Sequence, residues 1–202
     1  MIKLNIGCAA RPLGGYINID MDSKEDIIKR YPSIVIPDNI DIFQYDIFNL
    51  PFEDCSVNEV RCDCVMEHLS FKEEKIFWQE VKRVLKKSGA FNFCVPDFEF
   101  TVKAWLLAED NWLEFYRDDD WAIKNEHWFG HYKYSYDSRW GYLIASIFGS
   151  QNGDGQFHKN AYTEEKIKAI AKYLSFKVEE ITQINWKKDR PDKILKVKLI
   201  NE

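Results

Sequence analysis

KLNIGCAARPLGGYINID, residues 3–20, decides the fold of this 202-residue chain. A short apolar strand ends at Gly7, where the missing Cβ lets the backbone bend sharply and lets a ligand approach the main chain. A second β-rich run, residues 16–20, ends in Asp20. In a doubly wound sheet the ligand lies at the carboxyl ends of the strands, and an acid after the second strand takes ribose hydroxyls. The stretch therefore predicts a nucleoside site.

The connection between these two strands is too short for a full crossover helix, since parallel crossovers usually need about a dozen residues or more. We expect a turn or two of helix there, starting near Arg11 and Pro12. The later glycines of the G-x-G-x-x-G fingerprint are missing, so a pyrophosphate cradle is poorly supported. A nucleoside without phosphates fits better.

Hydrophobic periodicity and turn residues predict one α/β domain over residues 1–202. It is a single Rossmann-like doubly wound sheet, mostly parallel with an antiparallel C-terminal strand, plus an aromatic-rich helical cap insertion. We expect a cofactor-binding half (1–97), an inserted cap and substrate region (98–160), and a C-terminal helix with strands (161–202). Besides residues 2–6 and 16–20, strands are expected at 40–43, 57–64, 91–95, 177–184 and 194–200, and helices at 23–30, 72–85, 98–108, 142–148 and 164–174.

The first half of the chain resembles the class I S-adenosylmethionine-dependent methyltransferases, and most closely their small bacterial, methyltransferase type 11-like branch. The order and spacing of the motifs make this resemblance specific. The motifs are LNIGCA (4–9), GYINID (15–20), DIFNLPFEDCS (46–56), VMEHL (65–69), EVKRVLKKSG (80–89) and FCVPD (93–97).

The resemblance implies S-adenosylmethionine as the cofactor and implies which residues bind each part of it. Gly7 and the backbone of Cys8 and Ala9 would line the methionine part, and Asp20 would bind the ribose. The remaining members of the implied cofactor site are Asp46 for the adenine amino group, Ile47 beside the ring, and Cys62 with Asp63 at the end of the fourth strand.

Two departures from the family pattern bear on the site. Ala9 stands where relatives usually have glycine, which tightens the turn. Cys64 stands where relatives often carry histidine, which puts a catalytic role at that position in doubt.

Methyl transfer asks little of a protein, because the sulfonium cofactor carries an already activated methyl group. The chain must align a nucleophile, exclude water and, for a hydroxyl or a charged amine, supply a general base. The candidate catalytic residues are His68, His158 and Asp97. Each also has a structural interpretation: His68 as part of a helix start, His158 as a tie between loop and sheet, and Asp97 as a helix cap.

No metal site is expected. His127 and His131 have the i, i+4 spacing of a helical metal pair, but the surrounding aromatic residues favour an aromatic cap. Cys62 and Cys64 with His68 form a second candidate. Strand alternation puts both cysteines on one face, where they pack as small hydrophobic residues.

The substrate is expected to contact His127, Trp128, His131 and Arg139. The tryptophans and tyrosines between residues 112 and 140 are interleaved with Lys and Arg, and most of these rings form the core of a small cap. Such rings with polar tips also suit a sugar or another polar ring. By resemblance to relatives in surface-glycan pathways, we expect methylation of an O or N atom on a small polar or glycan-linked acceptor.

Composition limits the partners and the location. A net charge of −5 argues against nonspecific nucleic-acid binding. The five cysteines suit reduced cytoplasmic thiols, and neither a signal peptide nor a membrane-spanning run is seen. We therefore expect a cytoplasmic enzyme that could form a homodimer. Residues 98–160 or a partner subunit would supply any cover over the cofactor.

Two other functions stay open. The first is a catalytically inactive, cofactor-binding partner subunit, which Ala9 and Cys64 would suit. The second is a nicotinamide-dependent oxidoreductase, against which the missing glycine and the short first connection argue.

Overall fold

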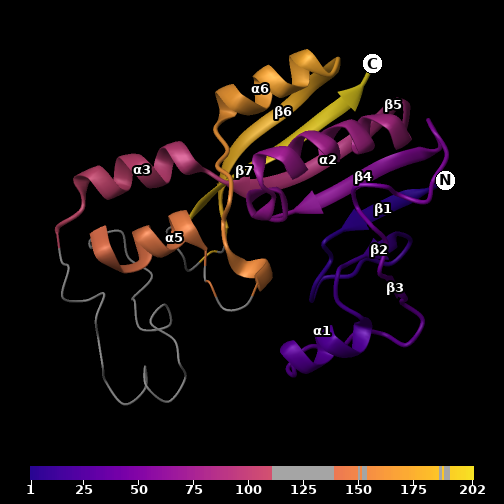
Figure 1. The fold of residues 1–202 in the computed structure, drawn as a ribbon, viewed down its shortest axis with the longest axis horizontal. Helices are drawn as coiled ribbons and strands as arrows, with labels where there is room; N and C mark the ends of the chain where they lie inside the picture. Colours follow the sequence, from indigo (N-terminus) through magenta and orange to yellow (C-terminus); the bar gives the residue numbers. More distant parts are fainter. Residues whose placement is uncertain (111–138, 150, 152–153, 187, 189–191) are drawn as a thin grey trace.

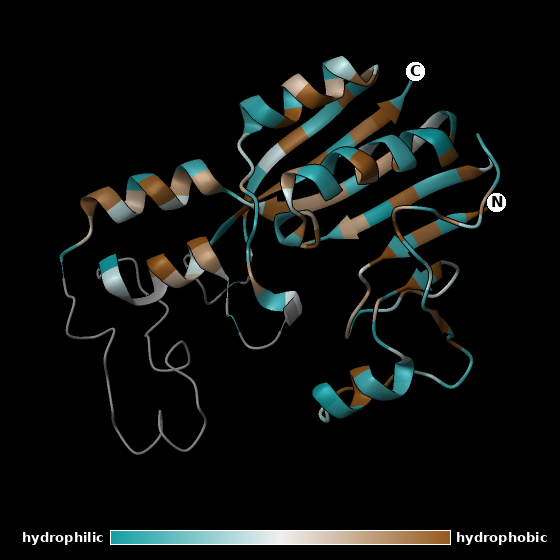
Figure 2. Ribbon diagram, in the orientation of Figure 1, coloured by the Kyte–Doolittle hydropathy of each residue, from teal (hydrophilic) through white to brown (hydrophobic). Residues whose placement is uncertain are grey.

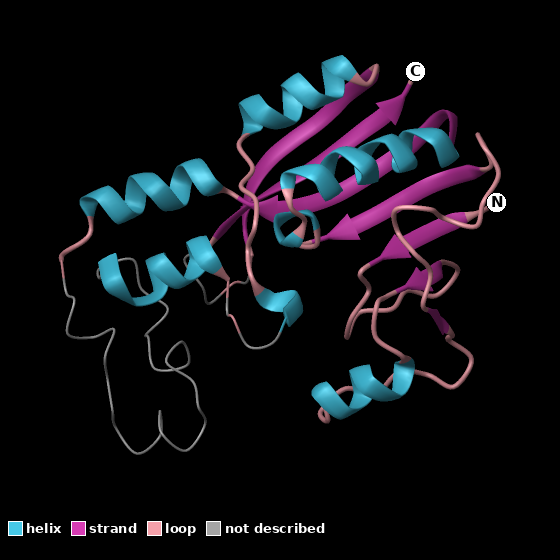
Figure 3. Ribbon diagram, viewed as in Figure 1, coloured by secondary structure: helices cyan, strands magenta, loops and turns pink. Residues whose placement is uncertain are grey.

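The computed structural model describes residues 1–110, 139–149, 151, 154–186, 188 and 192–202. In this part of the chain a seven-stranded sheet has the order β3-β2-β1-β4-β5-β7-β6 (Figures 1 and 3). The parallel strands are β1 (Lys3–Ile6), β2 (Ile17–Ile19), β3 (Ile42–Phe43), β4 (Val57–Asp63) and β5 (Leu85–Pro96). Strand β7 (Lys193–Asn201) runs antiparallel between β5 and β6 (Phe176–Asn185). The predicted mostly parallel, doubly wound sheet is confirmed.

Strands β1 and β4 bury one face of the sheet in the core. Leu4 is in register with Val60, and Ile6 with Cys62. All four side chains are fully buried, whereas Arg61, on the other face of β4, is exposed, because side chains alternate between the two faces of a strand. The strand order reverses between β1 and β4, and a doubly wound sheet binds its ligand at this point.

Two helices pack beside each other on one face of the sheet. Helix α2 (Phe71–Val84) begins with a capping box between Ser70 and Glu73, which stabilises a helix by about 1 kcal/mol. Helix α6 (Glu164–Tyr173) is capped by Thr163, and an ion pair of 2.8 Å joins it to α2. Polar and apolar residues alternate along α2 in Figure 2, as expected for an amphipathic helix.

An aromatic cluster ties α2 to the sheet. The ring of Trp78 lies 5.3 Å from that of Phe91 and 5.6 Å from that of Phe93, nearly perpendicular to both. Edge-to-face pairs of this kind add about 0.5–1.5 kcal/mol each beyond the burial of their surface.

The connection between β1 and β2 contains turns but no helix, so the helical turns predicted near Arg11 and Pro12 are wrong. Two buried asparagines stabilise the connection instead. The Asn18 Oδ1 atom accepts hydrogen bonds from the backbone N–H of Leu13 at 2.7 Å and from the Asn5 side chain at 2.9 Å. These bonds satisfy the loop backbone locally, which removes the need for helical hydrogen bonds.

Strand β5 begins at Leu85, directly after α2, and not at residue 91 as expected. The sequence does not predict this earlier start, because the polar residues Lys86–Ser88 lack strand periodicity. Gly89 sits so close to the chain that a Cβ there would lie 2.8 Å from the Lys86 carbonyl oxygen. Its role is therefore close backbone packing inside a strand.

Helices α3 (Phe98–Leu107) and α5 (Ile144–Phe148), with a π-helical turn at Arg139–Leu143, lie beyond the carboxyl ends of β4 and β5 (Figure 1). Both chain termini lie at the opposite end of the sheet. Helix α1 (Lys24–Arg30) follows β2, as the expected helix over 23–30 predicts, and is capped by Ser23. None of the helices in the described ranges is both long and apolar enough to span a bilayer.

Candidate active site

The turn after β1 can only be built with glycine. Gly7 has a φ of +64°, and a Cβ at this position would lie 2.2 Å from Cγ2 of Val65. Its backbone N–H donates to the Ile19 carbonyl oxygen at 2.8 Å, and the Cys8 N–H donates to the same oxygen at 3.2 Å. The turn is therefore held against the end of β2 while it packs closely on the segment that follows β4.

The acid at the end of β2 organises the same turn. Asp20 is buried, and its Oδ2 atom accepts the Ala9 N–H at 2.8 Å. Its Oδ1 atom accepts the Asp22 N–H at 3.1 Å. Ala9 has a φ of 39°, a region that favours glycine. The alanine at this position is therefore strained.

A cleft of about 370 Å³ opens at the switch point of the sheet. Its volume lies within the range of roughly 300–1,000 Å³ that small-molecule sites occupy. The cleft brings together two groups of predicted site residues, the cofactor candidates Gly7, Ala9 and Asp63 and the catalytic candidates His68 and His158.

The connection between β6 and β7 contributes a wall that the sequence does not reveal. Trp186, Asp192 and Lys193 line the cleft, and the Arg11 guanidinium lies 4.8 Å from the centre of the Trp186 ring. No local signal marks these residues, because only the pairing of β6 with β7 brings them to the site. Helix α5 and the following loop supply Ser146 and Gln156 to the opposite wall.

Five predicted cofactor residues do not line this cleft: Cys8, Asp20, Asp46, Ile47 and Cys62. The thiols of Cys8 and Cys62 are buried. Burial raises the pKa of Cys8 to about 12 and that of Cys62 above its usual range, so neither thiol is a nucleophile at neutral pH. Asp46 is exposed in a turn where its Oδ1 atom accepts the Phe48 N–H at 2.9 Å, and Ile47 packs partly buried against the core.

Helix α2 anchors the turn that carries Asp46. Oε1 of Glu80 accepts the Leu50 N–H at 2.6 Å, and the Arg83 guanidinium donates to the carbonyl oxygens of Leu50 and Phe52 at 3.1 and 2.8 Å. A hydrogen bond to Arg83 lowers the pKa of Glu80, which keeps this carboxylate ionised. The edge of the sheet beside β3 is thereby fixed.

Two residues at the end of β4 have partners that limit their chemistry. The Asp63 carboxylate pairs with Arg61 at 2.6 Å. Cys64 has a φ of 55°, and its sulfur lies 3.7 Å from that of Cys94. This contact raises the pKa of Cys64 well above its usual range, so the thiol stays protonated.

Two histidines that line the cleft lie next to each other in an edge-to-face arrangement. Nδ1 of His68 donates to the Phe157 carbonyl oxygen at 3.0 Å, and Nδ1 of His158 donates to the Ser146 carbonyl oxygen at 3.1 Å. Because a carbonyl can only accept, each ring holds its proton on Nδ1 and presents a lone pair on Nε2. The ring centres are 4.9 Å apart.

Burial keeps both imidazoles neutral at physiological pH. It lowers the pKa of His68, and together with the neighbouring His68 it lowers the pKa of His158 to about 4. Each ring is therefore an acceptor at pH 7. This tautomer and charge state are those of a proton acceptor or a metal ligand.

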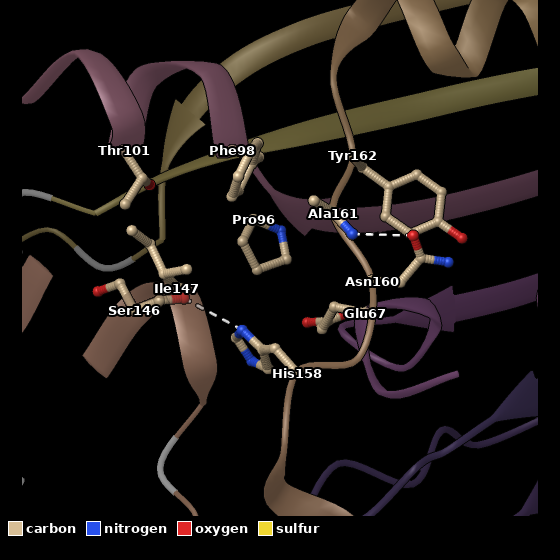
Figure 4. Close-up of a pocket in the computed structure, with 10 residues that line it drawn as sticks. All are labelled: Glu67, Pro96, Phe98, Thr101, Ser146, Ile147, His158, Asn160, Ala161 and Tyr162. Carbon is tan, nitrogen blue, oxygen red and sulfur yellow. Dashed lines mark hydrogen bonds between the residues drawn. The ribbon is translucent and has the colours of Figure 1, made fainter. Parts of the chain in front are cut away.

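Glu67 lies beside the two rings and is only 3% exposed. Burial raises the pKa of its carboxyl group to about 8. Its backbone oxygen accepts the N–H groups of Lys159 and Asn160 at 2.8 and 3.1 Å, which fastens the loop carrying His158 to the end of β4. In Figure 4 the Glu67 carboxyl group points toward the His158 ring.

The other predicted residues lie elsewhere. Asp97 is buried and caps α3: its oxygens accept hydrogen bonds from the Phe100 N–H and the Gln183 side chain at 3.0 and 2.6 Å. The Arg139 guanidinium binds carbonyl oxygens at the end of α3, including that of Trp105 at 3.0 Å. The substrate candidates His127, Trp128 and His131 lie outside the described residues.

Comparisons with known proteins agree with this geometry. The sequence model of the methyltransferase domain family matches residues 5–93. A comparison with curated proteins finds no match.

Solved structures share the whole fold at low sequence identity. An S-adenosylmethionine-dependent methyltransferase from Methanosarcina mazei is 13% identical, with a TM-score of 0.58 over 98% of this chain and 91% of that one. A putative methyltransferase from Haloferax volcanii, solved with the methyltransferase activator Trm112, is 12% identical, with a TM-score of 0.57 over 99% and 82%. The Burkholderia thailandensis 1,6-didemethyltoxoflavin-N1-methyltransferase, solved with bound 1,6-didemethyltoxoflavin and S-adenosylhomocysteine, is 8% identical, with a TM-score of 0.56 over 99% of this chain and 70% of that one.

The family match covers the strands that build the Gly7 turn and the end of β4, and the fold of the remaining chain agrees with it. Residues 5–93 thus match the methyltransferase domain family, and the chain shares its fold with solved S-adenosylmethionine-dependent methyltransferases.

Proposed function

We propose that the chain binds S-adenosylmethionine at the switch point of its sheet and transfers the methyl group to an O or N atom of a small polar acceptor. One observation carries the proposal: the Gly7 turn and the two neutral imidazoles line the same cleft. A cofactor turn and a pair of basic nitrogens facing one space are what a methyl transfer between two bound partners needs.

Three observations support the proposed cofactor site. Gly7, Ala9 and Asp63 line the cleft, glycine allows the close turn at residue 7, and Asp20 keeps the Gly7–Ala9 turn in place. The backbone of residues 7–9 would hold the amino-acid part. Asp20 would hold the ribose hydroxyls, and Asp46 with Ile47 would hold the adenine at the edge beside β3. The bound cofactor supplies an electrophilic methyl group on sulfur.

The residues of this chain then act on the acceptor. The Nε2 atoms of His68 and His158 carry lone pairs, and both residues line the cleft, so they would orient an acceptor O–H or N–H and take up its proton. Asp97 has a structural role as the cap of α3, so the proposed catalytic residues are the two histidines. Cys62 would contribute backbone alone, since its side chain is buried in the core.

The proposed acceptor is a sugar or a glycan-linked molecule, such as a nucleotide-sugar. Its support is the resemblance of the first half of the chain to a branch found in glycan pathways, together with the aromatic residues between positions 112 and 140. We also propose that the acceptor contacts His127, Trp128, His131 and Arg139. The same proposal includes a cytoplasmic location and assembly as a homodimer.

Transfer of labelled methyl groups tests the function. The purified chain is incubated with S-adenosylmethionine carrying a radioactive methyl group and with panels of nucleotide-sugars, free sugars and small heteroaromatic amines. Label should enter an acceptor with release of S-adenosylhomocysteine. His158→Asn should slow transfer by roughly 10²-fold or more, whereas Cys55→Ser, at an exposed site away from the cleft, should leave the rate unchanged. Cofactor binding without transfer to any panel member would refute the acceptor class.

A further inference from the structure

Glu67, His68 and His158 form a compact set of potential metal ligands. One ligand atom from each, a carboxylate oxygen and two ring nitrogens, lies within 4.8 Å of the other two. Two of the side chains come from the turn after β4, and the third comes from the loop before α6. The loop is fixed relative to the turn by the hydrogen bonds from Lys159 and Asn160 to the Glu67 carbonyl oxygen.

The second contacts of both histidines are those of metal ligands. A metal-binding imidazole usually donates its other N–H to a carbonyl or carboxylate, which fixes the tautomer and the direction of the lone pair. His68 does so to Phe157, and His158 does so to Ser146. Two neighbouring rings, each with its Nδ1 proton bound to a carbonyl oxygen, have the outer contacts that metal-binding imidazoles usually have.

The carboxylate gives an independent indication. Oε2 of Glu67 is buried and has no hydrogen-bond partner among the described residues. A buried oxygen without a partner costs free energy, and proteins keep such atoms where a ligand satisfies them. The Glu67 carboxyl group points toward His158 in Figure 4.

We propose that Glu67, His68 and His158 bind a divalent transition-metal ion whose open coordination position faces the cleft. Two imidazoles and one carboxylate are the ligands of open zinc and non-haem iron sites, whereas Mg²⁺ and Ca²⁺ prefer oxygen ligands alone. Metal–ligand bonds of about 2.0–2.1 Å in a tetrahedral site would bring the ligand atoms to roughly 3.3 Å from one another.

The position of the ion would define its use. All three residues line the cleft that also contains Gly7 and Ala9, so an acceptor oxygen on the ion would sit within the proposed active site. The ion would hold that oxygen and lower the pKa of its hydroxyl group. The histidines would then act through the ion and not as free bases. This consequence rests on the proposed function, whereas metal binding itself does not.

Cobalt provides the test, because Co²⁺ replaces zinc and has visible absorption that depends on its ligands. The full chain is stripped with EDTA, dialysed and titrated with CoCl₂, and Zn²⁺ then competes for the site. We expect one Co²⁺ per chain, a visible band of nitrogen and oxygen ligation, and displacement by Zn²⁺ but not by Mg²⁺. His68→Ala, His158→Ala and Glu67→Gln should each weaken binding about tenfold or more.

The double variant His127→Ala/His131→Ala is the matched control. It removes the two other histidines of the chain, which have the spacing of a helical metal pair, and should bind cobalt like the unmodified chain. Thermal unfolding of every variant shows that the loss of binding is not a loss of fold. No binding by the unmodified chain, a thiolate-to-cobalt charge-transfer band, or loss of binding in the control alone would overturn the proposal.

Calorimetry with S-adenosylhomocysteine on the same preparations separates this inference from the proposed function. A chain that binds S-adenosylhomocysteine but not cobalt would refute the metal site and leave the proposed methyl transfer intact. A chain that binds cobalt but not S-adenosylhomocysteine would refute the proposed methyl transfer and leave the metal site intact.

Discussion

Replacement of Gly7 by alanine should destabilise the fold through two separable effects. The first is the backbone, since a φ of +64° costs an alanine about 1–2 kcal/mol relative to glycine. The second is the overlap of the new Cβ with Cγ2 of Val65, 2.2 Å away. Overpacking of this kind costs roughly 1–3 kcal/mol. Together the two effects lower the free energy of unfolding by about 2–5 kcal/mol.

Val65→Ala separates the two effects. It removes the offending methyl group, and the next nearest atom, Cβ of Val65, would lie 3.4 Å from the new Cβ at position 7, which is ordinary contact. Val65→Ala alone should cost at most about 1.6 kcal/mol, the value of two fully buried methyl groups, because Val65 is only partly buried. The double variant Gly7→Ala/Val65→Ala should be more stable than the sum of the single effects by about 1–3 kcal/mol.

Urea unfolding followed by circular dichroism measures all four proteins of this cycle. A coupling energy within about 0.5 kcal/mol of zero would mean that the two sites are independent. The close approach of the Gly7 turn to Val65, and with it the reason why glycine is required there, would then be refuted.

Three further predictions concern the same region. In EDTA, the free energy of unfolding should fall as the pH rises from 6.5 to 8, because native Glu67, with a pKa of about 8, keeps a proton that the unfolded chain has lost. The slope is at most about 1.4 kcal/mol per pH unit, and urea unfolding of Glu67→Gln should show no such slope. The lowered pKa values of His68 and His158 act in the opposite direction and only below pH 6.5. Ala9→Gly should raise the free energy of unfolding by about 0.5–1 kcal/mol, because relief of a φ of 39° exceeds the added chain entropy; an unchanged or lower denaturation midpoint would contradict this. Arg83→Met should lower stability by roughly 1–3 kcal/mol and weaken S-adenosylhomocysteine binding, because the turn carrying Asp46 loses two of its anchors; equal affinity by calorimetry would separate this turn from the cofactor site.

The sequence predicts the sheet and the helices well where local patterns are strong. The apolar run before Gly7 predicts β1, and the 3.6-residue period after Ser70 predicts α2 to within a residue at each end. Local patterns fail at Arg11–Pro12 and at Lys86–Ser88. In the first case side chains of two buried asparagines satisfy the backbone. In the second case the polar stretch lies in an irregularity of the β4–β5 pairing, between the paired residues Leu85 and Ala90.

The candidate site divides in the same way. His68 and His158 are recognisable from their motifs, and the structure brings them to 4.9 Å from each other. The importance of Glu67 could not be predicted, because an acid next to a histidine has no local pattern that reveals its burial. Trp186 also escaped prediction, since only the antiparallel pairing of β6 with β7 brings it to the cleft.

Calorimetric titration with S-adenosylhomocysteine, beside NAD and beside an Asp20→Asn variant, tests the central claim most directly. We expect micromolar binding of S-adenosylhomocysteine by the unmodified chain, at least about tenfold weaker binding by the variant, and no binding of NAD. Binding of NAD in preference to S-adenosylhomocysteine, or equal affinity in the variant, would contradict the assignment of this cleft as a methyl-donor site.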